Sequence, residues 1–217
     1  MAQEVEIKLP ISNAKGFQRT LKRLGAVPVD AKSPRVHEMN LLFDTPEGGL
    51  AKHGQLLRIR TETPAAQKKP ASKGKPAQRY LLTFKSPPES LAIHTPTRQN
   101  RHKVREETEL VLTDAPALQK IFEGLGLRGW FRYEKFRTTY RLPARHKWAT
   151  GLLIELDETP IGTFVELEGP GPAIDRAASE LGFSARDFIT KNYLVLYLDN
   201  CRRQGETPTH MVFPKKI

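Results

Sequence analysis

The stretch Glu4-Val5-Glu6-Ile7-Lys8, near the start of the chain, alternates charged and apolar side chains at every position. Successive side chains of a β-strand point to opposite faces, so this alternation predicts a strand over residues 3–9 with one charged and one apolar face. The apolar face has to be covered, and we expect helices that follow in the sequence to supply the cover.

Several later segments also have the length and composition of strands, and turn residues separate most of them. A short helical turn is expected over residues 49–52, after Thr45-Pro46. Short, regularly spaced and mostly antiparallel strands point to a closed or nearly closed β-barrel with helices packed outside, an α+β fold. The predicted strands after the first cover residues 36–44, 56–62, 79–85, 103–112, 130–142, 151–157 and 163–168.

Four amphipathic helices are predicted between and after the strands, because apolar residues recur there at helical spacing beside capping or terminating residues. Their apolar stripes are suited to pack on the sheet. The capping and terminating residues are Ser12 or Asn13 with Gly25, Asp114 with Gly126, Gly182 for the third helix, and Ser184 for a last helix over residues 186–200.

Charged residues fall on one face of almost every predicted strand. Such a face is either solvated, as in most amphipathic strands, or it points into the lumen of a closed barrel. Helices outside the sheet and the close mixture of both signs of charge favour the lumen. The side chains that share a face are Arg58 and Arg60; Thr83 and Lys85; Arg105, Glu107 and Glu109; Lys135 and Arg137; Glu155 and Asp157; Glu166 and Glu168.

A lumen lined by both signs of charge requires a ligand that carries both kinds of partner, because buried ions without partners are costly. A polyphosphate with bound Mg²⁺ or Mn²⁺ meets this requirement. Arginine and lysine bind phosphate oxygens, and carboxylates bind hard divalent cations. The pattern therefore favours a metal-assisted site for a phosphate chain.

The formal net charge of +11 indicates an anionic partner without saying which kind. Part of this charge lies in residues 64–79, a Pro-, Ala- and Lys-rich stretch that is expected to be a flexible basic loop, and residues 86–101 form a second expected loop. A solvated loop is the simpler interpretation of the lysines, so no nucleic-acid partner is expected.

Other classes of protein fit the sequence poorly. Cys201 is the only cysteine, which rules out an internal disulfide framework, and the six histidines show no metal-ligand spacing. No run of about twenty apolar residues is present, so we expect a cytoplasmic protein without a membrane partner.

The run Glu4-x-Glu6-x-Lys8 resembles the Glu-x-Glu-x-Lys signature of the CYTH superfamily, also called triphosphate tunnel metalloenzymes. Later motifs resemble the other blocks of that family in the same order, and the match runs from about residue 4 to residue 198. These motifs are Asn40 to Asp44-Thr45-Pro46, Leu57-Arg58-Ile59-Arg60, Thr83-Phe84-Lys85, the strand with Arg105, Glu107 and Glu109, Lys135 with Arg137, Asp157, Gly162 to Glu168, and Tyr193.

The resemblance implies an eight-stranded antiparallel tunnel formed by residues 1–200, followed by a tail over residues 201–217. It also implies roles for individual residues, with Glu4, Glu6, Lys8, Arg58 and Lys85 acting most directly in catalysis. The implied metal ligands are Glu4, Glu6, Glu166 and Glu168, assisted by Glu155 or Asp157. The implied phosphate-binding residues are Lys8, Arg58, Arg60, Lys85, Arg105, Lys135 and Arg137, while Glu107 and Glu109 support them or bind a second metal ion.

The first functional hypothesis is a triphosphatase that depends on Mg²⁺ or Mn²⁺ and acts on tripolyphosphate, thiamine triphosphate, ATP or a similar small molecule. The second is a class IV-like adenylate cyclase that forms cyclic AMP from ATP. The third is a non-catalytic binder of polyphosphate or nucleic acid. The oligomeric state is left open, with a homodimer among the expectations.

Overall fold

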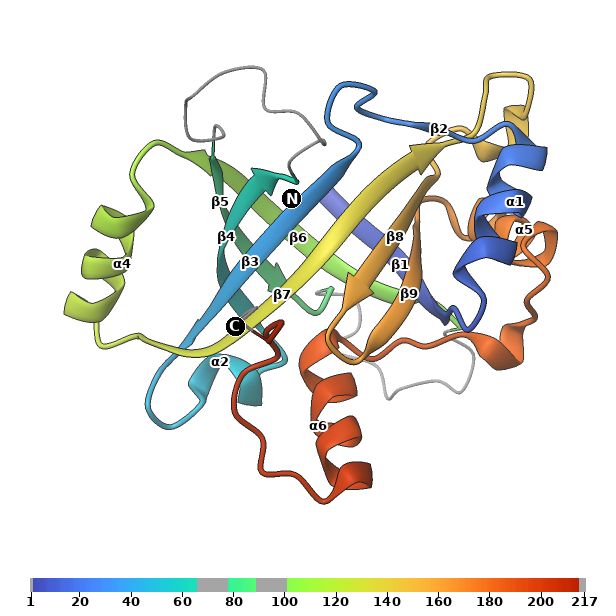
Figure 1. Ribbon diagram of the computed structural model, residues 1–217. Coiled ribbons are helices and arrows are strands. Elements are labelled where there is room, and N and C mark those ends of the chain that lie inside the picture. The colour runs from blue at the N-terminus through green and yellow to red at the C-terminus, as the bar shows by residue number, and fades with distance from the viewer. Residues whose placement is uncertain (1, 66–77, 89–100, 215–217) are drawn as a thin grey trace.

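Eight antiparallel strands form a closed barrel in the computed structural model, which describes residues 2–65, 78–88 and 101–214. Most of the two expected loops, residues 66–77 and 89–100, lies outside the described residues. Around the ring the order is β7-β3-β4-β5-β6-β1-β9-β8, and β8 pairs again with β7 (Figure 1). The bounds are β1 Ala2–Pro10, β3 Arg35–Asp44, β4 Leu56–Pro64, β5 Arg79–Ser86, β6 Lys103–Leu112, β7 Arg128–Arg141, β8 Leu153–Thr159 and β9 Gly162–Glu168.

The charged faces that the alternation predicts on β1, β4, β5, β6, β7, β8 and β9 all contribute to the lining of the barrel interior. Glu4 of β1 lies opposite Arg105 of β6, and Glu6 lies opposite Glu168 of β9. One short strand was not predicted: β2, Val27–Pro28, pairs with the outer end of β7. The closed antiparallel barrel with helices outside is therefore confirmed.

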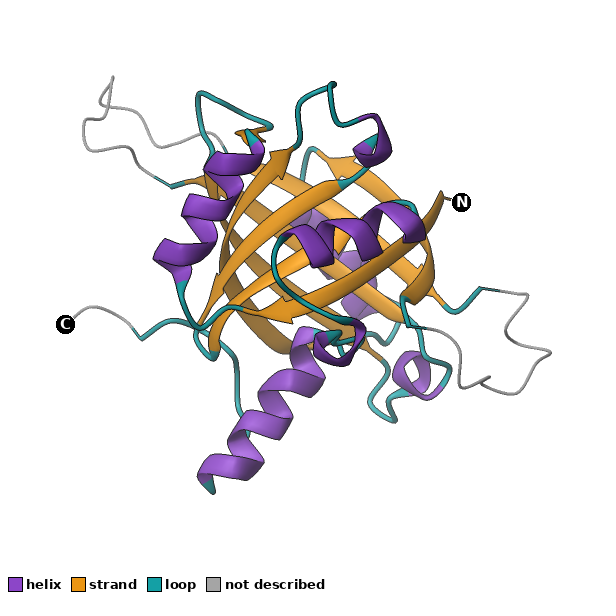
Figure 2. Ribbon diagram, turned by 90° about the vertical axis from the view of Figure 1, so that its right-hand side faces the viewer, coloured by secondary structure: helices purple, strands orange, loops and turns teal. Residues whose placement is uncertain are grey.

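Helices pack against the apolar outer face at two sides of the barrel, as Figures 1 and 2 show. On one side α1, Ala14–Leu24, and α5, Gly171–Glu180, cover a core that includes Ile7, Val165 and Leu167. On the other side α4, Ala115–Gly124, packs Phe122 against Phe43 of β3. A single helical turn, α2 at Gly49–Lys52, follows β3 as expected.

The N-caps of the first two predicted helices agree with the sequence. The side chain of Asn13 accepts a hydrogen bond from the Gly16 amide, which resolves the choice between Ser12 and Asn13, and Asp114 accepts one from Ala117. Each cap satisfies an amide that the helix itself leaves free.

The prediction of a last helix over residues 186–200 was wrong in its boundaries. Ser184 caps only a single 3-10 turn, Ala185–Asp187, and α6 spans Tyr193–Gln204. Between them Ile189 is extended, because its amide and carbonyl both bond Lys8 of β1 at 2.9 Å. The side chain of Asn192 then caps α6 through the amide of Val195. Pairing with the barrel thus overrides the helical pattern of the sequence.

Helix α6 lies below one end of the barrel, and the chain after it returns to β7 (Figure 1). The amide of Met211 bonds the carbonyl of Arg132, and the amide of Glu134 bonds the carbonyl of Met211. Met211 is buried in a cluster with Phe131 and Tyr197. Among the described residues, no helix is long and apolar enough to cross a membrane.

Candidate active site

The barrel encloses a cavity of about 440 Å³ whose wall is almost entirely charged. The described lining contains seven basic and seven acidic side chains, and the remaining positions are Gln3, Asn192, Tyr133, Tyr193, Leu56 and Leu153. Because the two signs balance, a bound ligand must offer partners to both. The charged lining residues are Lys8, Arg58, Arg60, Lys85, Lys103, Lys135, Arg137, Glu4, Glu6, Glu107, Glu109, Glu155, Glu166 and Glu168.

Carboxylates crowd together where β1, β9 and β8 run side by side. Glu155 lies opposite Glu166 in the register of β8 and β9, and Glu168 lies opposite Glu6. Burial, opposed by Arg137 and reinforced by Glu166, raises the pKa of Glu155 to about 7. Burial together with Glu155 and Glu4 raises the pKa of Glu168 to about 8. In this part of the wall, the neighbouring basic side chains do not fully compensate the negative charge of the carboxylates.

Three ammonium groups bind the two N-terminal glutamates. Lys85 Nζ donates to both carboxylate oxygens of Glu4, at 2.6 and 2.7 Å. Lys103 Nζ donates to Glu6 Oε1 at 2.6 Å, and Lys8 Nζ donates to the same oxygen at 3.1 Å. Burial opposes ionisation of Glu6, but Lys8 and Lys103 outweigh it and lower its pKa to about 2. The carboxylate of Glu6 is therefore held as an anion by lysines, and that of Glu4 is paired with Lys85.

Asp157 of β8 binds cationic side chains of the adjacent strand β7 without lining the cavity itself. Its Oδ2 accepts hydrogen bonds from Lys135 at 2.9 Å, Arg137 at 2.6 Å and the Tyr193 hydroxyl at 2.7 Å. Arg137 also reaches Glu166 and Glu155. Asp157 is fully buried, so all of its hydrogen-bonding capacity is directed to these neighbours.

Glu38 of β3 is a second buried carboxylate among cations. Its oxygens lie 3.4 Å from Arg60 Nε, 3.5 Å from Lys135 Nζ and 3.7 Å from Arg137 Nε. Burial opposes its charge, but Arg60, Lys135 and Arg137 outweigh that and hold the pKa of Glu38 far below its ordinary value. Asn40, two residues on, accepts from Arg60 Nε at 3.1 Å.

Arg58 is oriented by two hydroxyl groups. Its Nη1 donates to the Tyr133 hydroxyl at 2.9 Å, and its Nη2 donates to Thr83 Oγ1 at 3.0 Å. Its Nε is buried without a hydrogen-bond partner among the described residues, as is Nε of Arg105. Buried polar groups are normally paired, so an unpaired donor beside this cavity is suited to an anionic ligand.

The chemistry of the donor set suits a hard divalent cation, although no three His, Cys, Asp or Glu side chains in the described part of the chain already surround one point as a metal requires. Carboxylate oxygens are the ligands that Mg²⁺ and Mn²⁺ prefer. The raised pKa values of Glu155 and Glu168 mark surplus negative charge that a cation would neutralise. The residues present thus fit a metal ion once the lysines bound to Glu4 and Glu6 move aside.

The structure brings together most of the side chains that the sequence marks for the site, and it separates two of them. Glu155 lines the cavity, whereas Asp157 lies behind it. Arg105 faces Glu4 across the register but is not among the lining residues. Glu107 contacts Lys85 at 3.3 Å, in keeping with a supporting position.

Sequence reasoning missed several side chains of the site: Lys103, Tyr133 and Asn192 line the cavity, and Glu38 and Asn40 contact Arg60. Glu38 and Asn40 lie in a strand whose two faces are both rich in apolar residues, so its charged face is not evident. Lys103 has the same strand parity as Arg105, which is the signal that could have identified it. Tyr133 likewise has the parity of Lys135.

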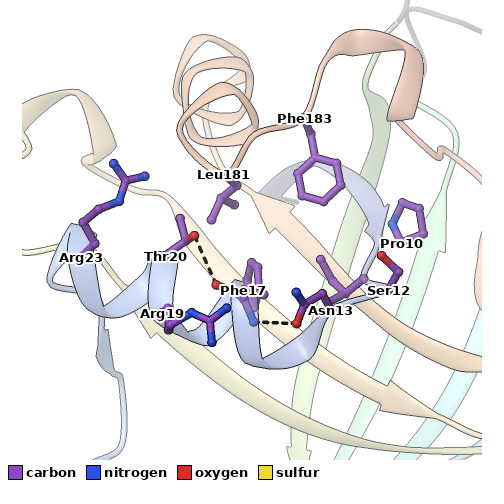
Figure 3. A pocket seen from close by; sticks show the side chains of 11 residues that line it. Pro10, Ser12, Asn13, Phe17, Arg19, Thr20, Arg23, Leu181 and Phe183 are labelled. Carbon is purple, nitrogen blue, oxygen red and sulfur yellow. Dashed lines mark hydrogen bonds between the residues drawn. The ribbon is translucent and has the colours of Figure 1, made fainter.

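A second hollow, about 490 Å³, lies outside the barrel between α1 and the chain after α5 (Figure 3). Its lining includes no carboxylate. Asn13 and Thr20, two of its polar side chains, already bond the backbone of α1 at Gly16 (Figure 3). The hollow therefore lacks the mixture of carboxylates and basic groups found in the lumen.

Comparison with models of protein families shows the family to which this chain belongs. A model of the CYTH domain matches residues 2–193. The chain belongs to the CYTH family. A search of curated protein sequences returned no match to this CYTH protein.

Solved structures resemble the CYTH protein over most of its length. A candidate adenylate cyclase of Vibrio parahaemolyticus is 17% identical, with a TM-score of 0.64 over 89% of this chain and 96% of that one. A protein of Pyrococcus horikoshii is 20% identical, with a TM-score of 0.63 over 91% and 99%. A candidate adenylyl cyclase of Hippeastrum, described as having a dominant triphosphatase activity, is 20% identical, with a TM-score of 0.51 over 94% and 97%. At these identities the similarity establishes the fold.

Proposed function

We propose that this CYTH protein is a triphosphatase that depends on Mg²⁺ or Mn²⁺ and acts on inorganic triphosphate or a small organic triphosphate. One observation carries the proposal: a single lumen combines crowded carboxylates of raised pKa with buried, oriented guanidinium and ammonium groups. A phosphate chain with its metal ion is a ligand that satisfies both. The triphosphatase activity described for the Hippeastrum relative agrees with this assignment.

The basic side chains of the lumen would bind and orient the phosphate chain. Arg58, held by Tyr133 and Thr83, and Lys135, held by Asp157, face the cavity in fixed positions. Fixed donors stabilise charge that spreads over phosphate oxygens in the transition state without having to reorganise. Hydrolysis requires water to attack the terminal phosphorus while the bond to the bridging oxygen breaks and the shortened chain leaves with the electron pair.

The carboxylates Glu4, Glu6, Glu155, Glu166 and Glu168 are the residues that would hold the metal ion. When bound, Mg²⁺ or Mn²⁺ supplies a Lewis acid that neutralises phosphate charge and lowers the pKa of a bound water. Among these carboxylates, Lys8 and Arg137 keep Glu166 ionised, because they outweigh its burial and lower its pKa well below the ordinary value.

The lining favours the phosphate chain over a nucleobase as the recognised group. A base needs an aromatic face or an apolar slot, but the Tyr193 ring has Lys8 Nζ and Lys135 Nζ 5.3 and 5.1 Å from its centroid. Tyr133 and Tyr193 are both buried. Within the described lining, the aliphatic side chains are those of Leu56 and Leu153. The Tyr133 hydroxyl accepts a hydrogen bond from Arg58 and the Tyr193 ring lies beside two lysines, which supports hydrolysis more than the cyclisation of ATP.

The test is an assay of the purified full chain with Mg²⁺ or Mn²⁺ against tripolyphosphate, ATP and thiamine triphosphate, with phosphate, pyrophosphate and cyclic AMP resolved. We expect phosphate release that stops with EDTA and falls about 100-fold or more in Glu6→Gln, which removes one anionic metal ligand. Glu123→Gln, on the exposed face of α4, is the matched control and should retain activity.

Two results would reject the proposal. Cyclic AMP as the main product from ATP would identify a cyclase. The absence of turnover with every triphosphate and both metals, in a protein that still binds tripolyphosphate, would identify a non-catalytic binder.

A further inference from the structure

Lys103 occupies a position in the lumen that no motif of the sequence marks. It begins β6, and its Nζ donates to Glu6 Oε1 at 2.6 Å, the same oxygen that Lys8 contacts at 3.1 Å. The carboxylate expected to bind metal is therefore already paired with two ammonium groups. A divalent cation can approach this oxygen only if at least one of them leaves, because like charges repel at such distances.

Lys103 is the ammonium group that is free to leave. The side chain of Lys8 is only 3% exposed and is also tied to Glu166 at 3.2 Å. The side chain of Lys103 is 18% exposed, and among the described residues it forms an ion pair with Glu6 alone. Losing one contact from a partly open position disturbs less of the site than breaking two buried contacts.

A displaced Lys103 remains beside the cavity and needs another anion. The neighbouring carboxylate Glu4 is already held through both oxygens by Lys85. A phosphate oxygen in the same cavity is an available partner, since ammonium groups bind phosphate as point charges. The lysine can therefore move from a protein carboxylate to the ligand in a single change of side-chain conformation.

We propose that Lys103 is a further phosphate-binding residue, which exchanges Glu6 for the triphosphate when the metal ion takes its place on Glu6. The exchange rests on the proposed function of the lumen. Metal alone must displace Lys103 with no new anion to receive it, and triphosphate alone must take Lys103 from Glu6 and leave that carboxylate exposed to negative charge. When both bind, the metal ion takes the place of Lys103 on Glu6 and the triphosphate receives Lys103. Each ligand therefore raises the affinity for the other.

Separate binding of the two ligands tests this exchange. Lys103→Met removes the competitor of the metal, so Mn²⁺ alone, titrated by electron paramagnetic resonance, should bind about 5-fold to 10-fold more tightly. The same variant loses a phosphate contact, so tripolyphosphate alone, titrated calorimetrically with EDTA present, should bind about 5-fold to 10-fold more weakly. One substitution thus changes the two affinities in opposite directions.

Two controls accompany the Met variant. Lys120→Met removes the same charge from the exposed face of α4 and should leave both affinities within about 2-fold, because screening weakens distant charges. Lys103→Arg keeps the charge, so its affinities for Mn²⁺ and for tripolyphosphate should both be close to those of the wild type. Thermal unfolding verifies that each variant is folded, and Lys103→Gln provides the same test if the Met variant is not.

Unchanged or weaker Mn²⁺ binding in Lys103→Met overturns the exchange, as does unchanged tripolyphosphate binding. If the wild type hydrolyses triphosphate while either of these results is found, the exchange fails and the proposed function stands. If the wild type binds neither probe, whether each is added alone or both are added together, the proposed function fails and takes the exchange with it.

Discussion

Arg137 and Asp157, on the adjacent strands β7 and β8, form a two-point ion pair: Nε donates to Oδ1 at 2.7 Å and Nη2 donates to Oδ2 at 2.6 Å. The planar guanidinium matches the planar carboxylate, and its other edge reaches Glu155 and Glu166. One arginine thus fixes the positions of carboxylates on two strands.

Replacing Arg137 by lysine should disrupt the site although the charge is kept. An ammonium group cannot make the two parallel bonds to Asp157 and also reach the two glutamates. We expect triphosphate turnover to fall about 100-fold, because misplaced groups near the reacting atoms are costly. Steady-state kinetics with tripolyphosphate measure the loss. Arg132→Lys, on the exposed outer face of the same strand, should leave the rate unchanged, and an equal loss there would contradict this account.

Glu38 should make the stability of the protein depend on pH. Its pKa in the folded state lies below the ordinary value near 4.5, so its contribution is fully present above that value and is lost as the pH falls below it. Glu38→Gln should lower the free energy of unfolding by about 3 kcal/mol at pH 7, because Arg60, Lys135 and Arg137 lose a buried partner. Urea unfolding from pH 7 to pH 3 should show this difference shrinking toward acid.

The comparison for Glu38 is Glu158, whose side chain is 44% exposed in its ion pair with Arg35. Exposed pairs contribute little, so Glu158→Gln should change stability by less than about 1 kcal/mol. A difference between wild type and Glu38→Gln that stays constant with pH would show that the carboxylate charge is not the cause.

Asp44 should stabilise the turn that follows β3. Its Oδ1 accepts hydrogen bonds from the amides of Thr45 at 2.7 Å and Leu50 at 2.8 Å, and its Oδ2 accepts one from Ala51 at 3.0 Å. Asp44→Ala leaves these amides without their charged partner and should cost about 2–3 kcal/mol in denaturant unfolding. Asp30→Ala removes two similar bonds at an exposed turn, where water replaces them, and should cost less than about 1 kcal/mol. Equal costs would contradict the importance of burial.

Gly169 should not tolerate a side chain. A Cβ atom there would lie 2.6 Å from the carbonyl oxygen of Gly151 and 3.0 Å from Cα of Leu152, and its φ of +145° disfavours other residues. Because both obstacles are backbone, Gly169→Ala should cost about 3 kcal/mol or more. Gly182→Ala, at φ +88° with open space around it, should cost about 1 kcal/mol. Thermal unfolding distinguishes the two, and similar midpoints would contradict the steric cause.

The sequence predicts the barrel well because period-two alternation records which side of a strand is covered by helices. The same periodicity cannot separate residues of equal parity, and for this reason Glu155 and Asp157 look equivalent although one reaches the lumen and the other lies behind it. Depth along the barrel axis depends on strand tilt and on neighbouring side chains, which the pattern of one strand does not encode.

The remaining differences come from contacts between distant segments. Helix α6 starts at Tyr193 because Ile189 pairs with Lys8, and nothing near Ser184 indicates that pairing. Glu38 is not evident from the sequence because apolar residues occur on both faces of β3, and its contacts with Arg60, Lys135 and Arg137 come from other strands. In both places, contacts with distant segments of the chain determine the structure, and the local hydrophobic pattern does not reveal them.

The charged interior of this barrel also disfavours incorrect strand registers during folding. A strand that slipped by one residue would turn apolar side chains into the lumen and charged ones under the helices, so the error would be penalised on both surfaces. In β1, such a slip would place Ile7 among the lysines and Glu6 beneath α5. Because the ring is closed, every strand must also keep its hydrogen-bond register with two neighbouring strands. The groups that would bind the ligand therefore help to select the correct alignment of the strands while the protein folds.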